Sequence, residues 1–168
     1  STLRKDHPLI ANRLRQSAKR GLQVNVVNPM DDDWLMKVAN KAIVAPNQIA
    51  DMLAQILKAV AEAKQVAVPT VAANITVSDS VRKIAATLTE KENAAVLLGY
   101  LSQHAPNYSS LYIMAQQIAQ LSGAKFGLLG EAANSVGAHI AKATPTGKGL
   151  NAAQMFAQPR KAYVLLGV

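Results

Sequence analysis

The sequence contains no cysteine. This absence excludes disulfide bonds, thiolate nucleophiles, thiolate zinc sites and cysteine-ligated iron–sulfur clusters within the chain. The histidines at positions 7, 104 and 139 are too far apart in sequence to form a helical metal-binding pair. We therefore predict no metal site in this chain.

Aromatic residues are also scarce, at 4% of the chain, whereas the net charge is +8. Residues 1–20 carry six Lys and Arg against Asp6, a net +5, and such a segment could contact nucleic acid or an acidic partner. A helix here would align Ile10, Leu14 and Ala18 and turn the cations elsewhere. No run of aromatic residues is available to stack bases. We interpret the cations as a solvated helix face, with a nucleic-acid-binding domain as an alternative.

Long apolar runs are missing too, although half of the residues are apolar and only 17% are charged. None approaches the roughly 20 apolar residues that a membrane-spanning helix needs. The first residues carry charge where a secretory signal would be apolar. Because the sequence starts without Met and stops in an apolar run, we expect an excised piece of a longer protein.

The pattern of apolar residues predicts alternating helices and strands. We expect a helix capped by Asp6 and ended by Gly21, a strand at 22–28, a short strand or extended segment at 41–46 and a helix over 47–64. Pro69 and small residues indicate an extended crossover at 67–77. We predict two small lobes, at 1–66 and 78–168.

The second lobe contains a short apolar run that recurs as VLLG at 96–99, GLLG at 127–130 and VLLG at 164–167. Each run is typical of a strand buried on both faces of a parallel sheet, and helical patterns separate them. We predict an α/β fold with a Rossmann-like parallel sheet and helices on both faces. Gly99 and Gly130 would end their strands at the edge where such sheets bind ligands.

No catalytic pattern is present. The glycine turns lack G-x-G-x-x-G, and TPTGKGLN lacks both the first glycine and the Ser or Thr of a phosphate-binding loop. The serines have no G-x-S-x-G context, and His104 is interpreted as a loop histidine. The adjacent Asp31, Asp32 and Asp33 are interpreted as caps of a solvated turn, because consecutive residues do not converge on one ligand.

Two long stretches resemble molybdopterin-type oxidoreductases. They are DHPLIANRLRQSAKRGLQVNVVNPMDDDW at 6–34 and the segment 81–141, which ends in EAANSVGAHIA. Together with NAAQMFAQPRKAYVLLGV at 151–168, they are most similar to the large iron–sulfur subunit of bacterial NADH-quinone oxidoreductase, respiratory complex I. The resemblance covers nearly the whole chain.

This resemblance implies a region of a complex that passes electrons from NADH to quinone and translocates protons. In catalytic relatives a strand-end Asp-Pro-Arg turn helps to hold the nucleotide part of the pterin cofactor, whereas this chain has Asn28, Pro29 and Met30. Loss of the arginine removes a bidentate phosphate donor. The resemblance therefore implies a non-catalytic scaffold without a cofactor, in which Asn28, Met30, Gly99 and Gly130 mark a vestigial crevice.

The resemblance further implies iron–sulfur clusters in a cysteine-rich region upstream of this sequence. It also implies other subunits of the peripheral arm as partners, and a cytoplasmic location on the inner face of the bacterial plasma membrane without direct insertion. A working pterin- or nucleotide-binding module remains an alternative.

Overall fold

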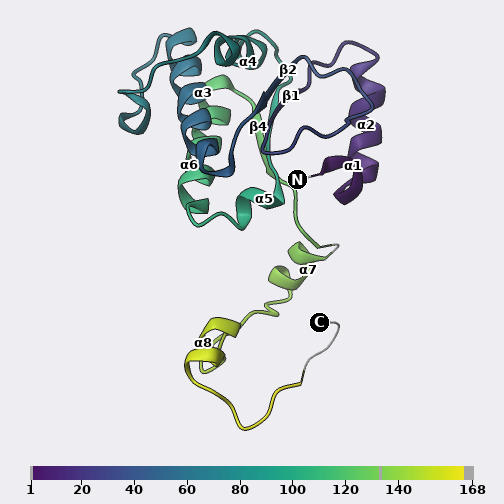
Figure 1. The fold of residues 1–168 in the computed structure, drawn as a ribbon, viewed down its shortest axis with the longest axis vertical. Coiled ribbons are helices and arrows are strands. Elements are labelled where there is room, and N and C mark those ends of the chain that lie inside the picture. Colours follow the sequence, from purple (N-terminus) through teal and green to yellow (C-terminus); the bar gives the residue numbers. More distant parts are fainter. Residues whose placement is uncertain (1, 133, 165–168) are drawn as a thin grey trace. The chain divides into compact units, whose positions relative to one another are not determined.

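Parallel strand pairs form the centre of the structure. The computed structural model describes residues 2–132 and 134–164 (Figure 1). β1 (Asn25–Asn28) pairs in parallel with β2 (Asn40–Ile43), and β3 (Ala95–Leu98) pairs in parallel with β4 (Lys125–Leu128). The fold is thus mixed α/β, and the predicted parallel pairing of the runs at 96–99 and 127–130 is confirmed.

Helices precede, separate and follow these strands along the chain, and both helices predicted by residue number, the one ended by Gly21 and the one over 47–64, are present. The helices are α1 (Leu3–Asp6), α2 (Pro8–Ala18), α3 (Ile49–Ala63), α4 (Asp79–Thr89), α5 (Tyr100–Gln103), α6 (Tyr108–Ser122), α7 (Ser135–Ile140) and α8 (Ala152–Ala157), with 3-10 turns at Pro46–Gln48 and Thr70–Ala72. The helical pattern between the runs at 96–99 and 127–130 predicts a stop at Gly123, and α6 does end there, with Gly123 at a left-handed φ of 75°.

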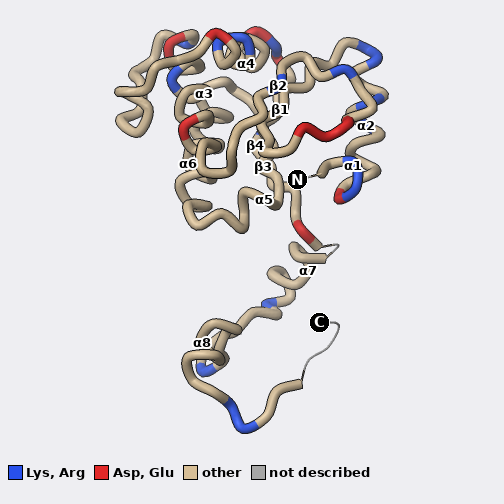
Figure 2. Tube along the Cα trace, viewed as in Figure 1, with Lys and Arg blue, Asp and Glu red and all other residues tan. Residues whose placement is uncertain are grey.

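The predicted cap of the first long helix is wrong by one residue. Asp6 belongs to α1, and His7, with φ −135° and ψ 62°, is the N-cap of α2. Pro8 explains the shift, because a residue before proline is pushed out of the helical region. The cations Arg13, Arg15 and Lys19 lie on or beside α2, as expected of a solvated face (Figure 2).

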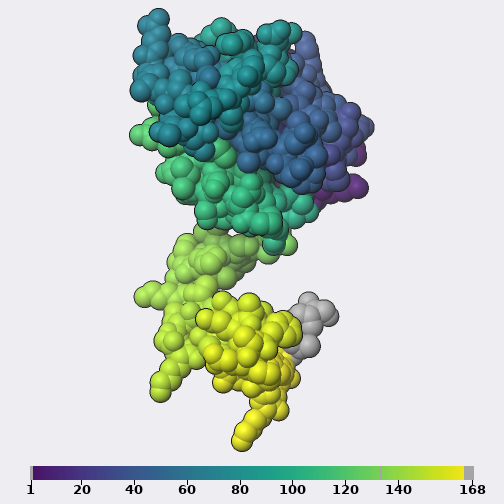
Figure 3. Space-filling view, turned by 60° about the vertical axis from the view of Figure 1, so that its left-hand side comes forward, coloured from purple at the N-terminus to yellow at the C-terminus, as the bar shows by residue number. Residues whose placement is uncertain are grey.

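The core lies where α3 packs against α4 and α6. Leu57 and Val60 of α3 and Val81 of α4 are fully buried, and Leu111 of α6 is 1% exposed. The space-filling view shows blue, teal and green segments of the first unit packed against one another (Figure 3). Burial of these aliphatic side chains supplies the main driving force for folding.

The predicted burial of both faces of the sheet is wrong for β3. Leu98 is 6% exposed, but Leu97 on the opposite face is 46% exposed. The helices of the core cover the face that carries Val96, whereas the face of Leu97 has less cover. The predicted third strand, at 161–167, lies partly outside the described residues, and residues 161–164 form no strand.

Contacts divide the chain into two units, Ser1–Leu129 and Gly130–Val168. The core of the first unit includes residues from both predicted lobes, such as Leu57 and Ile118. The lobe boundaries at 66 and 78 stay a prediction. In the second unit, α8 is capped by Asn151, whose side chain accepts a hydrogen bond from the amide of Gln154 at 2.9 Å. Within the described residues, no helix has the length and apolar character needed to cross a membrane.

Candidate functional site

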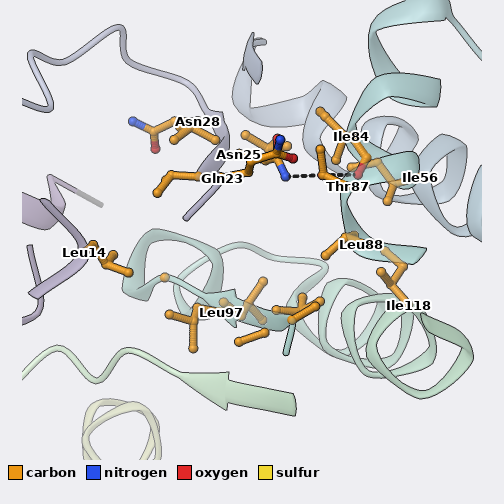
Figure 4. A pocket seen from close by; sticks show the side chains of 18 of the residues that line it. Leu14, Gln23, Asn25, Asn28, Ile56, Ile84, Thr87, Leu88, Leu97 and Ile118 are labelled. Carbon is orange, nitrogen blue, oxygen red and sulfur yellow. Dashed lines mark hydrogen bonds between the residues drawn. The ribbon is translucent and has the colours of Figure 1, made fainter. Parts of the chain in front are cut away.

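A large cavity lies between the two strand pairs of the first unit. We call it the inter-sheet cavity; its volume is about 830 Å³. The backbone from Gln23 to Asn28 forms one wall, and the backbone from Asn93 to Gly99 forms the other. Figure 4 shows side chains from several elements around it.

The floor of the inter-sheet cavity is apolar. Ile56 of α3, Ile84 and Leu88 of α4 and Ile118 of α6 line it (Figure 4). Ile56, Ile84 and Ile118 also belong to the buried core, with exposures of 4%, 3% and 2%. The cavity is therefore bounded on one side by the hydrophobic core of the unit. An apolar ligand would be favoured there over a charged one.

One polar network crosses the wall of β1. The Nδ2 atom of Asn25 donates to Oγ1 of Thr87 at 2.5 Å, and Oδ1 of Asn25 accepts from Nδ2 of Asn40 at 2.8 Å. Thr87 in turn donates to the carbonyl of Ile84 at 2.7 Å. These bonds tie both strands of the first pair to α4, and they use the amide of Asn25 within the protein (Figure 4).

The carboxyl ends of β1 and β3 meet at this cavity, as expected for parallel strands. Asn28, Pro29, Gly99 and Ser102 all line it. The charged lining residues, Glu90 to Glu92, precede β3 and so belong to its amino end. The carboxyl end thus lacks a charged side chain among the described lining residues, and it offers no cation for a phosphate.

Asn28 serves the turn that follows β1. It is 4% exposed, and its Nδ2 atom donates to the carbonyl of Met30 at 2.8 Å. Its own carbonyl accepts from the amide of Val44 at 3.2 Å. An asparagine that bonds two residues ahead is a common way to fix a turn.

The structure brings together only part of the predicted crevice. Asn28 and Gly99 line one cavity, whereas Met30 is 44% exposed and outside the lining. Gly130 belongs to the second unit. Gly99 has a φ of −76°, which any residue adopts, so its conformation does not explain why glycine is there.

The roles of Asn25 and Thr87 were not predicted. Their hydrogen bond joins residues 62 positions apart, and neither residue belongs to a recognisable motif. A polar residue at the start of a β-branched strand is a weak signal of a buried network, and it could have pointed to Asn25.

The acidic turn behaves as expected. Asp31 pairs with Nζ of Lys41 at 2.5 Å, and Oδ1 of Asp33 accepts from the amide of Leu35 at 3.0 Å. His104 is the C-cap of α5, and its ring lies 6.1 Å from that of Tyr100. Among the described residues no group of three or more histidines and acids lies together to hold a metal ion.

Comparison with protein-family models, curated proteins and solved structures finds no match to this chain. The groups that line the inter-sheet cavity therefore indicate what it can bind. It presents backbone edges, apolar side chains and internally bonded amides, a combination suited to binding an apolar or extended ligand rather than to acid–base chemistry.

Proposed function

We propose that this chain is a non-catalytic α/β scaffold region of the large iron–sulfur subunit of an NADH-quinone oxidoreductase. The complex as a whole oxidises NADH, reduces quinone and translocates protons. This region shapes the subunit and contacts other subunits of the peripheral arm, on the cytoplasmic side of the membrane. The Rossmann-like, molybdopterin-oxidoreductase-like fold is part of the same proposal.

The state of the strand-end turn supports the scaffold role most directly. The buried amide of Asn28 is bonded to the carbonyl of Met30, so it serves turn geometry. No cation lines the carboxyl end of the cavity among the described residues. A nucleotide site of the kind found in pterin enzymes would need donors for phosphate and base at this position.

A nucleotide titration tests whether the turn after β1 still takes part in binding a nucleotide. We expect neither the wild-type chain nor the double variant Asn28→Asp/Met30→Arg to bind guanine nucleotides at micromolar concentration in calorimetry. The double variant leaves the residues after β3 unchanged, and there Gly99, Leu101 and Ser102 supply backbone, apolar and hydroxyl groups but no cation. Micromolar binding by the wild-type chain would favour a working nucleotide-binding module instead.

Membership of the complex is tested in membranes. A tagged full-length polypeptide that contains this region should comigrate with NADH-quinone reductase activity on a native gel. Within the assembled complex, the variant Asn28→Ala should leave turnover per complex unchanged, whereas the core variant Leu57→Ala should reduce the amount assembled. Failure to comigrate would refute the assignment, and lower turnover in fully assembled Asn28→Ala complexes would refute the scaffold role.

A further inference from the structure

The inter-sheet cavity separates two strand edges that have no strand partner among the described residues. β1 is paired only with β2, and β3 only with β4. The carbonyls of Val24 and Asn28 accept bonds from the β2 side at 2.7 and 3.2 Å, and those of Ala94 and Leu98 accept bonds from the β4 side at 2.9 and 3.0 Å. The remaining edges therefore face the cavity.

The residues that present these edges can be identified. Backbone groups of successive strand residues point to opposite edges. Asn25 and Val27 thus direct their N–H and C=O groups away from β2, and Ala95 and Leu97 direct theirs away from β4. All four residues line the cavity. An open strand edge of this kind is a template for another strand.

The chemistry of the cavity fits an extended apolar peptide. Its walls are strand edges, which offer alternating donors and acceptors, and its floor is made of Ile56, Ile84, Leu88 and Ile118. A compact polar ligand would leave both backbone edges and the apolar floor unmatched. A strand would satisfy the edges with its backbone and the floor with every second side chain.

We propose that the inter-sheet cavity binds one apolar β-strand, parallel to β1 and β3, which joins the two pairs into a single five-stranded sheet. We assign this strand to the stretch of polypeptide that leads directly into α1. This proposal uses only sheet geometry and does not depend on the proposed function.

The position of α1 supports the assignment of the added strand to the polypeptide that precedes α1. Leu3 is 6% exposed and lines the same cavity as Asn28 and Gly99. Figure 1 draws α1 at about the level of α5, which follows the carboxyl end of β3. A strand that ends beside Leu3 would therefore run in the same direction as β1 and β3.

The resulting connection is a standard strand–helix–strand unit. The new strand would lead through α1 and α2 to β1, its neighbour in the sheet, and consecutive parallel strands are usually neighbours of this kind. Numbered along the chain with the new strand first, the sheet order becomes 3-2-1-4-5. That is the order of the first five strands in one of the two common doubly wound sheets, the one with order 3-2-1-4-5-6.

The experiment adds a strand in the predicted place. The hexapeptide Ala-Ala-Val-Leu-Leu-Gly, which repeats residues 94–99, is fused directly before Ser1 of the full chain. One matched control carries Pro in place of Val and the second Leu, since proline cannot donate to a ladder. A second control carries the unmodified hexapeptide after Val168. Amide hydrogen exchange is measured at Asn25, Val27, Ala95 and Leu97.

The amino-terminal fusion should slow exchange at these four amides by about tenfold or more, and should raise Tm by roughly 5 °C. Neither control should do so, and sedimentation should show a monomer. Unchanged exchange in a folded fusion would overturn the proposal. Equally slow exchange in the carboxyl-terminal control, or slow exchange accompanied by dimerisation, would overturn the assignment of the strand to the polypeptide that leads into α1.

A trans experiment covers the case of a fusion that does not fold. The free hexapeptide is titrated onto the wild-type chain while the same four amides are followed. Protection that increases with peptide concentration and is absent with the proline peptide supports the strand site. No protection at millimolar peptide, or protection already present in the wild-type chain alone, refutes it.

Discussion

At the residue scale, Asn28 is a buried polar side chain that holds the turn after β1. Its amide is buried and donates to the carbonyl of Met30. The side chain of Met30 is 44% exposed. The Asn28 side chain should therefore contribute more to the stability of the turn than the Met30 side chain does. Substitutions at the two positions should therefore differ in cost.

We expect Asn28→Ala to lower the free energy of unfolding by about 1–3 kcal/mol, because the variant removes a buried side chain and its hydrogen bond to the carbonyl of Met30. Met30→Ala should cost less than about 0.5 kcal/mol, as for most exposed positions. Urea denaturation of both variants measures the difference. Equal losses would contradict the proposed role of the Asn28 amide.

Gly123 presents a second residue-scale test, because its φ is 75° and a Cβ atom there would meet nothing within 4 Å. Gly123→Ala should therefore lose about 1 kcal/mol from backbone strain alone. Gly130→Ala, at a glycine without positive φ and with its nearest atom 3.9 Å away, is the matched control. Thermal melting should show a lower Tm for the first variant only.

At the element scale, α3 carries the core. Its residues Ala54, Ile56, Leu57, Ala59 and Val60 are buried among α4, α6 and the strands. Small alanines alternate with large aliphatic residues on this face, which lets α4 and α6 approach closely. The burial is consistent with the regular spacing of apolar residues that predicts the helix.

Leu57→Ala should cost about 3–5 kcal/mol, because Leu57 is fully buried and its truncation leaves a cavity. Leu9→Ala on α2 is the control, since Leu9 is 79% exposed and should change stability by less than about 0.5 kcal/mol. Chemical denaturation compares the two. A small loss at Leu57 would mean that α3 does not pack as described.

The elements were largely predictable because their signals are local. Gly123 and the apolar spacing of α3 and α6 act within a few residues of the structure they specify. The parallel pairing of β3 and β4 followed from the helix between them. The N-cap at His7 was missed because the constraint from Pro8 outweighed the capping preference of Asp6.

The candidate site was less predictable because it depends on contacts between distant residues. Asn28 and Gly99 could be placed at strand ends from sequence alone, and the structure brings them to one cavity. The cavity itself depends on how far β1 lies from β3, and no local pattern encodes that separation. The Asn25–Thr87 bond has the same origin.

At the scale of the whole molecule, burial is concentrated in one of the two units. Every buried residue of the described chain lies at or before Ser122, and neither α7 nor α8 has a buried residue. Val136, Ile140 and Phe156 are 70%, 77% and 85% exposed. The second unit therefore contributes little of the apolar burial that stabilises a fold.

A truncation tests this unequal distribution. The chain shortened to residues 1–129 should unfold in one cooperative transition, with a free energy of unfolding within about 1 kcal/mol of the full chain, because the core cluster of α3, α4 and α6 is retained. The isolated segment 130–168 should show no cooperative transition, since a chain this short rarely buries enough apolar surface to fold alone. Circular dichroism and calorimetry on the two pieces measure both outcomes. A large loss of stability in the shortened chain would show that the second unit stabilises the first, and the two units would then unfold as one cooperative body.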